Sequence, residues 1–286
     1  MTSRLASRIS DNALVIERVL GVRYVVPLRE GGSLPAVVDT AGGDAFVVKF
    51  LGAGQGVRAL VAEALAAGLA LKLDLPVPKP AIVRLEEGFG QAEPDPEIQD
   101  ILRGSVGENF GLAYLAGSVA FDPVADADLA RQQAAEIVWF DALISNVDRT
   151  PRNTNLLTWR GRLWMIDHGA SLYFHHRWPG WEDKAHSPFP QIKDHVLLGL
   201  AGDLQDADAR LRPRLDDRAV REVVEALPEA WLGDEPLFPS VEAHRAAYST
   251  YLSARLGGPR RWLQEALDAQ RRGPETLPRR VTHRVV

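Results

Sequence analysis

The segment from Asn146 to Ser171, NVDRTPRNTNLLTWRGRLWMIDHGAS, constrains the fold of this chain more than any other. Two short apolar runs flank the sequence WRGR, which predicts a pair of strands joined by a tight turn. Asp148 and, five positions later, Asn153 come just before the first strand, and Asp167 closes the second. The sequence therefore predicts a β-hairpin with two carboxylates and an amide at its ends.

Length, charge and cysteine content exclude several classes of protein. A chain of 286 residues can form one large domain or two lobes that share a cleft. The net charge of −5 argues against direct binding of nucleic acid. The absence of cysteine excludes disulfides, thiolate zinc sites and cysteine nucleophiles. No signal-peptide pattern or apolar run of membrane-spanning length is visible, so we expect a cytoplasmic protein without a membrane partner.

The order of apolar segments predicts an α+β protein with two lobes. The first part of the chain has five candidate strands, at residues 22–28, 36–39, 45–51, 81–85 and 110–115. One alanine- and leucine-rich helix is expected over residues 57–73, and the prolines of LPVPKP end it. A short helix is expected in the acidic loop over residues 93–105.

The second part is expected to be helical. A helix over residues 129–145 has Asp126 as a plausible cap and one apolar face, and further helices run through residues 192–271. We expect a β-rich N-lobe over residues 1–115, a helical C-lobe over residues 116–286, and a cleft between them.

Five residues, in this order along the chain, suit phosphoryl transfer from a nucleotide. Lys49 lies in an apolar strand and can hold the α- and β-phosphates of ATP, and Glu63 in the next helix can orient it. Asp148 can accept the proton of the acceptor hydroxyl. Asn153 and Asp167 supply the hard oxygen atoms that Mg²⁺ prefers. The sequence thus predicts ATP and Mg²⁺ as cofactors, with Lys49 and Asp148 as catalytic residues.

These segments resemble the HipA-like family of atypical kinases and, more distantly, the phosphatidylinositol 3/4-kinases. The resemblance covers residues 22–175 and rests on VVKF, GSLPAVV, VAEALAAGLALKLDLPVPKP and the pattern Asp-x4-Asn before a strand pair that ends in Asp. It implies a two-lobed kinase fold, ATP with Mg²⁺, and transfer to a protein hydroxyl. Two positions depart from the family pattern: Thr150 stands where a histidine is common, and His168 where an apolar residue follows the metal-binding aspartate.

Two glycine-rich turns are candidates for the phosphate loop. Gly31, Gly32 and Ser33 precede the lysine strand by a whole hairpin, where such a loop is expected, and we favour them. The second turn, GAGQG at residues 52–56, opens the predicted helix, and a plain flexible turn explains either. Ser33 could also accept a phosphoryl group from a second molecule, which would switch the enzyme off. We further assign Tyr114 and Leu115, at the lobe boundary, to the nucleotide site.

Two other groups of residues allow more than one interpretation. Arg149 and Arg152 flank Asp148, and they could steer an anionic acceptor or pair with local carboxylates. Five histidines fall within 28 positions and raise the possibility of a zinc site. The aromatic surroundings of these histidines favour packing and hydrogen bonding instead.

The leading hypothesis is an ATP-dependent kinase acting on a protein serine or threonine. The first alternative is a small-molecule phosphotransferase of the aminoglycoside or choline type. Those enzymes usually have a histidine where Asn146 stands, although the acidic DLQDADAR segment keeps this alternative open. The second alternative is a pseudokinase that binds nucleotide without turnover, and the complete set Lys49, Asp148, Asn153 and Asp167 argues against it. The resemblance also makes an antitoxin-type protein partner possible.

Overall fold

The computed structural model describes residues 16–28, 34–123 and 131–273. Its N-terminal part is a closed five-stranded barrel in the order β1-β2-β3-β5-β4. The β1–β4 pair is parallel and the other pairs are antiparallel. The strands are β1 (Glu17–Pro27), β2 (Ala36–Thr40), β3 (Ala45–Lys49), β4 (Pro80–Leu85) and β5 (Gly107–Ala113). Closure leaves every strand paired on both sides, which is how small barrels avoid exposed edges.

The barrel interior is filled by alternate apolar residues of its strands, among them Val38, Phe46, Val48 and Val83, all at most 1% exposed. Gly111 of β5 makes this packing possible. A Cβ atom at Gly111 would lie 2.8 Å from the Cγ2 atom of Val83, closer than carbon atoms can approach. Helix α2 (Pro96–Arg103), which Asp95 caps through the backbone N–H of Glu97, adds its apolar side to the same cluster.

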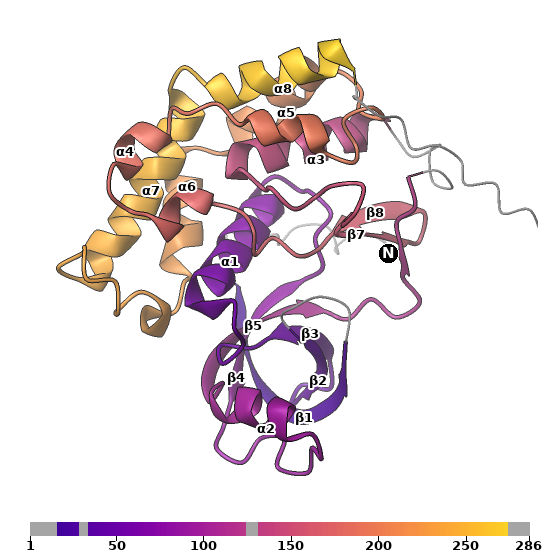
Figure 1. Cartoon of the computed structure of the whole chain (residues 1–286), viewed down its shortest axis with the longest axis vertical. Helices are drawn as coiled ribbons and strands as arrows, with labels where there is room; N and C mark the ends of the chain where they lie inside the picture. Colours follow the sequence, from indigo (N-terminus) through magenta and orange to yellow (C-terminus); the bar gives the residue numbers. More distant parts are fainter. Residues whose placement is uncertain (1–15, 29–33, 124–130, 274–286) are drawn as a thin grey trace, which may run out of the picture.

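Helix α1 (Gly56–Lys72) joins the barrel to the helical part of the molecule and lies between them (Figure 1). Its residues 59–70 are all buried. Small side chains allow the close contact: a Cβ atom at Gly68 would lie 2.7 Å from the Cγ1 atom of Val223 in α6 (Asp217–Glu225). Because α1 packs against both parts, the side chains that it projects can serve a site between them.

The C-terminal part is a helical assembly with one small antiparallel sheet (Figure 1). The sheet consists of β6 (Val119–Ala120), β7 (Leu156–Trp159) and β8 (Arg162–Met165). Besides α6, the helices are α3 (Arg131–Ile144), α4 (Trp181–Lys184), α5 (Leu204–Leu211), α7 (Val241–Gly257) and α8 (Arg261–Arg272). Four short 3₁₀ helices are η1 (Tyr173–His176), η2 (Pro190–Asp194), η3 (Arg212–Arg214) and η4 (Glu229–Trp231).

The predicted α+β architecture, with a β-rich N-lobe and a helical C-lobe, is confirmed. The helix predicted over residues 57–73 is α1, and the predicted hairpin is β7–β8. The first strand is longer than predicted, because it continues from residue 22 back to Glu17 by pairing in parallel with β4. The helix predicted to have a single apolar face, α3, is instead buried on all sides over residues 137–144.

Three predictions about the fold are not tested by the structure. Asp126, the expected cap of α3, lies outside them, and so does the turn between β1 and β2. The lobe boundary at residue 115 stays a prediction; it falls between the end of β5 and the start of β6. Within the described part of the chain, no helix combines the length and apolar character needed to cross a membrane.

Candidate active site

Lys49, Glu63 and Asp167 meet in one ion cluster. The Nζ atom of Lys49, the last residue of β3, lies 2.5 Å from Oε1 of Glu63 and 2.5 Å from Oδ1 of Asp167. The Glu63 side chain is fully buried in α1, whereas 37% of the Asp167 side chain is exposed. Residues from a barrel strand, the connecting helix and the end of β8 thus form one group, which is open to solvent on the aspartate side.

The charges of this cluster stabilise one another. Burial alone would lower the pKa of Lys49, but the carboxylates of Glu63 and Asp167 outweigh burial and raise it. Burial alone would raise the pKa of Glu63, yet Lys49 first, and His168 second, hold it well below its usual range. Lys49 is therefore a cation and Glu63 an anion at neutral pH.

The backbone after β8 brings Asp167 against this lysine. Asp167 adopts a left-handed conformation with φ of 53°, which few residues other than glycine, asparagine and aspartate tolerate. Gly169 then passes close to the cluster, since a Cβ atom there would lie 3.4 Å from Oε1 of Glu63 and 3.6 Å from Nζ of Lys49. Between them, His168 is fully buried, with Nδ1 3.7 Å from Oε2 of Glu63. The ring of His168 packs edge-on to Phe140.

Asp148 lies in a loop in which two side-chain amides donate hydrogen bonds to its carboxylate. The side-chain amide of Asn153 donates to Oδ2 of Asp148 at 2.8 Å, and that of Asn155 donates to the same atom at 3.2 Å. Asn155 also adopts a left-handed conformation and donates to the main-chain oxygen of Asp148. The sequence analysis missed Asn155; its signal is the second asparagine of RNTN, a residue type that accepts positive φ.

Asp167 and Asn153, the predicted metal ligands, lie in two neighbouring parts of the site: Asp167 in the ion cluster with Lys49, and Asn153 against Asp148. No group of three or more His, Asp or Glu side chains that could hold a metal occurs among residues 16–28, 34–123 and 131–273. Magnesium is usually held in kinases by one or two protein oxygens together with phosphate oxygens and water. The partly exposed carboxylate of Asp167 and the exposed amide of Asn153 are oxygen donors of that kind, whereas a protein-only zinc site would need more ligands.

Comparison with known proteins assigns the chain to a family. The sequence model of the HipA-like kinases matches residues 22–254, most of the chain. The protein belongs to the HipA-like kinase family. The match extends through most of the helical part, well beyond residue 175, where the sequence resemblance ended. Members of this family are phosphotransferases, so the chain is an enzyme of that class.

A solved structure shares the fold of this HipA-like kinase. It is the crystal structure of a Helicobacter pylori proinflammatory kinase, CtkA, at 13% sequence identity and a TM-score of 0.50. The likeness covers 82% of this chain and 94% of that chain. No curated protein matches the sequence.

The residues predicted to contact the nucleotide outside the ion cluster are only partly described. Gly31, Gly32 and Ser33 lie outside the described residues. Tyr114 is 48% exposed, and its backbone N–H donates to the carbonyl of Ala45, at the start of β3. Leu115 follows it in the segment between β5 and β6. Both residues lie on the segment between β5 and β6, and their contact with the nucleotide stays a prediction.

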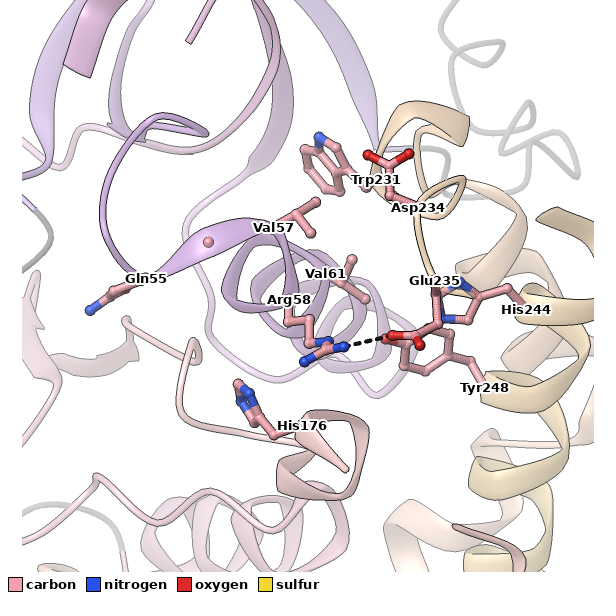
Figure 2. Close-up of a pocket in the computed structure, with 11 residues that line it drawn as sticks. Gln55, Val57, Arg58, Val61, His176, Trp231, Asp234, Glu235, His244 and Tyr248 are labelled. Carbon is pink, nitrogen blue, oxygen red and sulfur yellow. Dashed lines mark hydrogen bonds and ion pairs between the residues drawn. The ribbon is translucent and has the colours of Figure 1, made fainter. Parts of the chain in front are cut away.

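The second glycine turn leads to a different feature, a cavity of about 280 Å³ at the N-terminus of α1 (Figure 2). Gln55, just before α1, and Val57, Arg58 and Val61 of α1 line one side of it, and Arg58 donates to Glu235 across it at 2.6 Å. Val61 precedes Glu63 by two positions, so the two side chains point to opposite sides of the helix. Gly56 of this candidate turn lines the cavity, whereas Lys49, Glu63 and Asp167 do not. The Arg58–Glu235 ion pair connects the start of α1 to the helical lobe.

The histidines have packing and hydrogen-bonding roles in the structure. His175 is buried, and its Nδ1 atom lies 3.0 Å from the hydroxyl of Tyr248. His244, which the sequence analysis did not single out, stacks between Phe238 and Tyr248. Burial lowers the pKa of His175 and of His244, so both rings are neutral at pH 7. These contacts favour the packing interpretation over a zinc site.

Proposed function

We propose that this HipA-like kinase binds ATP with Mg²⁺ and transfers the γ-phosphoryl group to a serine or threonine hydroxyl of a protein. The observation that carries the proposal is the ion cluster of Lys49, Glu63 and Asp167. It holds a lysine in a fixed position and charge state beside a carboxylate that remains accessible to a ligand. Binding of nucleotide phosphates needs such a cation, and binding of a metal needs such a carboxylate.

The nucleotide side of the mechanism follows from these charges. Lys49 would contact the α- and β-phosphates, and Glu63 keeps it from turning away, because the buried Glu63 carboxylate has Lys49 as its main partner. Asp167 and Asn153 would hold Mg²⁺. When bound, the metal neutralises charge on the transferred phosphoryl group. Asp167 can exchange its bond to Lys49 for the metal because it is the exposed member of the cluster.

Asp148 would act on the acceptor. The hydrogen bonds from Asn153 and Asn155 go to Oδ2, which leaves Oδ1 for a hydroxyl of the substrate. The acceptor O–H bond breaks as its oxygen forms a bond to the γ-phosphorus, Asp148 accepts the proton, and ADP leaves. Arg149 does not steer the acceptor, since it is 1% exposed and paired with Asp141. Arg152 is exposed and is free to do so.

Incubation of a cell lysate with the pure protein and γ-labelled ATP tests the proposed acceptor. Mass spectrometry should find labelled serine or threonine in one or a few proteins, and Asp148→Asn should abolish the label. Label in small molecules with none in protein would establish the phosphotransferase alternative instead. ATP binding without any transfer would establish the pseudokinase alternative.

A further inference from the structure

A second buried ion cluster lies beneath the loop that carries Asp148. Its centre is Asp141 of α3, which is fully buried and takes no part in the mechanism above. Three side chains donate to its carboxylate: Asn146 through Nδ2 at 3.0 Å, Arg149 through Nε at 2.5 Å and His195 through Nε2 at 2.8 Å. A carboxylate this deeply buried is costly unless it is fully paired, so the arrangement must hold its partners tightly.

Two of these partners stand on either side of Asp148 in the sequence. Asn146 binds Asp141 with its amide nitrogen and accepts the backbone N–H of Asp148 at 3.1 Å with its amide oxygen. Arg149 follows Asp148 directly. The chain is therefore fixed to Asp141 both before and after Asp148, which leaves the Asp148 side chain to reach Asn153 and Asn155.

Arg149 also connects this loop to the segment after β8 that contains Asp167. Its Nη1 atom donates to the carbonyl of Ile166, the residue before Asp167, at 3.3 Å. The same atom donates to the carbonyl of Asn155, which is in turn bonded to the backbone N–H of Ile166 at 3.1 Å. One buried guanidinium thus spans the two loops that present Asp148 and Asp167.

His195 completes the cluster as a neutral ring with a defined tautomer. The backbone N–H of Leu197 donates to Nδ1 of His195 at 3.0 Å, so Nδ1 is an acceptor and the ring proton is on Nε2. That proton is donated to Asp141. Next to His195, the backbone N–H of Val196 donates to the carbonyl of Arg149 at 3.0 Å. The segment after η2 is therefore bonded to α3 through Asp141 and to the Asp148 loop through Arg149.

We propose that Asp141 is a positioning residue, which sets the place of Asp148 relative to Asp167 through Arg149, and that His195 supports it as a neutral donor. The inference rests on the proposed kinase function, because it assigns a role in aligning that reaction. Misplacing a catalytic group by about 1 Å can lower a rate about a hundredfold, so an anchor of this kind affects turnover more than nucleotide binding.

Replacement of Asp141 by asparagine tests the anchor. Asp141→Asn keeps the shape of the side chain but removes its charge and one of its acceptor oxygens. Asp208→Asn is the matched control, because Asp208 contacts the same helix through Trp139 and pairs with Arg260 away from the loop. With ATP and Mg²⁺ alone, ADP release by Asp141→Asn should show kcat reduced about a hundredfold and KM for ATP within about threefold of wild type. Asp208→Asn should keep both values.

Two variants of His195 separate a positioning role from a purely structural one. His195→Gln can keep an N–H donor near the position of Nε2, so its kcat should stay within about threefold of wild type. His195→Leu removes the donor, and its kcat should fall about tenfold. Equal kcat values for these two variants, or equal losses for Asp141→Asn and Asp208→Asn, would overturn the proposal.

Hydrogen exchange separates this inference from the proposed function. Without nucleotide, the amides of residues 146–156 should exchange faster in Asp141→Asn than in wild type or in Asp208→Asn. If wild type transfers no label from ATP to any acceptor in the lysate, the kinase proposal fails on its own, and the exchange experiment still decides the anchor. Unchanged exchange in Asp141→Asn would show that Asp141 does not hold the loop.

Discussion

Among the described residues, two ion clusters hold a buried cation against carboxylate groups, and they differ in access to solvent. In the first, Lys49 bridges Glu63 and Asp167, and the Asp167 side chain is 37% exposed. In the second, Asp141 and Arg149 are both sealed, with side chains that are 0% exposed. A buried ion pair by itself therefore does not mark a ligand site. The cluster of Lys49, Glu63 and Asp167, here the open cluster, can exchange one partner for a nucleotide or a metal. The cluster of Asp141 and Arg149, here the sealed cluster, can only hold the backbone in place.

The largest effect is expected at Asp148. The sealed cluster holds the loop of this residue, and its proposed role is in the phosphoryl transfer that the open cluster supports. Asp148→Asn should lower the rate of phosphoryl transfer by about 10² to 10⁴, because the group acts in the transition state. The affinity for ATP, measured by calorimetric titration, should stay within about twofold. Loss of ATP binding would instead make Asp148 a metal ligand or a structural residue.

Removing the cation of the open cluster should be costly in stability. Lys49→Met leaves Glu63 as a buried carboxylate without its main partner, and loss of one member of a buried pair costs about 3 to 5 kcal/mol. The double variant Lys49→Met with Glu63→Leu should recover most of that loss in urea unfolding. If the single and double variants are equally stable, Glu63 is not held as an anion by Lys49.

The neutral histidines predict a loss of stability at mildly acidic pH. Burial lowers the pKa of His175 and of His195, although Asp141 opposes the change at His195. Below about pH 6.5 the unfolded chain takes up protons that the folded chain does not, so stability falls as the pH decreases. Each ring contributes at most about 1.4 kcal/mol per pH unit.

Urea unfolding at pH 7.5 and at pH 5.5 measures this effect. His195→Gln should show a smaller difference between the two pH values than wild type. The pKa values of Glu63 and Asp141 are also lowered, but carboxylates that titrate near pH 4 in the unfolded chain affect stability only at lower pH. Equal stability at pH 7.5 and 5.5 would mean that these rings can be protonated in the folded protein.

The smallest effect is expected at the cavity on the other side of α1. Arg58 is 41% exposed at its side chain, so its ion pair with Glu235 should contribute less than about 1 kcal/mol. Arg58→Ala should lower the affinity for ATP by no more than about threefold, like the surface control Arg103→Ala. A tenfold loss in Arg58→Ala alone would show that this face of α1 controls the Lys49–Glu63 pair.

The open cluster could be predicted from the sequence and the sealed cluster could not. Lys49 and Asp167 are 118 residues apart, yet the chemistry of phosphoryl transfer connects a lysine in a strand with an aspartate after a hairpin. Asp141 carries no comparable signal, since an aspartate in a helix usually faces solvent. Its one clue is the apolar sequence IVWFDALI around it, which the structure buries on every side. The roles of Arg149 and His195 arise from contacts that only the folded chain makes.

Calorimetric titration of ATP with and without Mg²⁺ tests most directly whether the open cluster binds a metal–nucleotide complex. Wild type should bind ATP at least about tenfold more tightly with Mg²⁺ than without it, because the metal neutralises phosphate charge that Lys49 alone cannot. Asp167→Ala should lose most of this dependence on Mg²⁺. Equal affinities of wild type and Asp167→Ala for ATP in the presence of Mg²⁺ would contradict the assignment of the site.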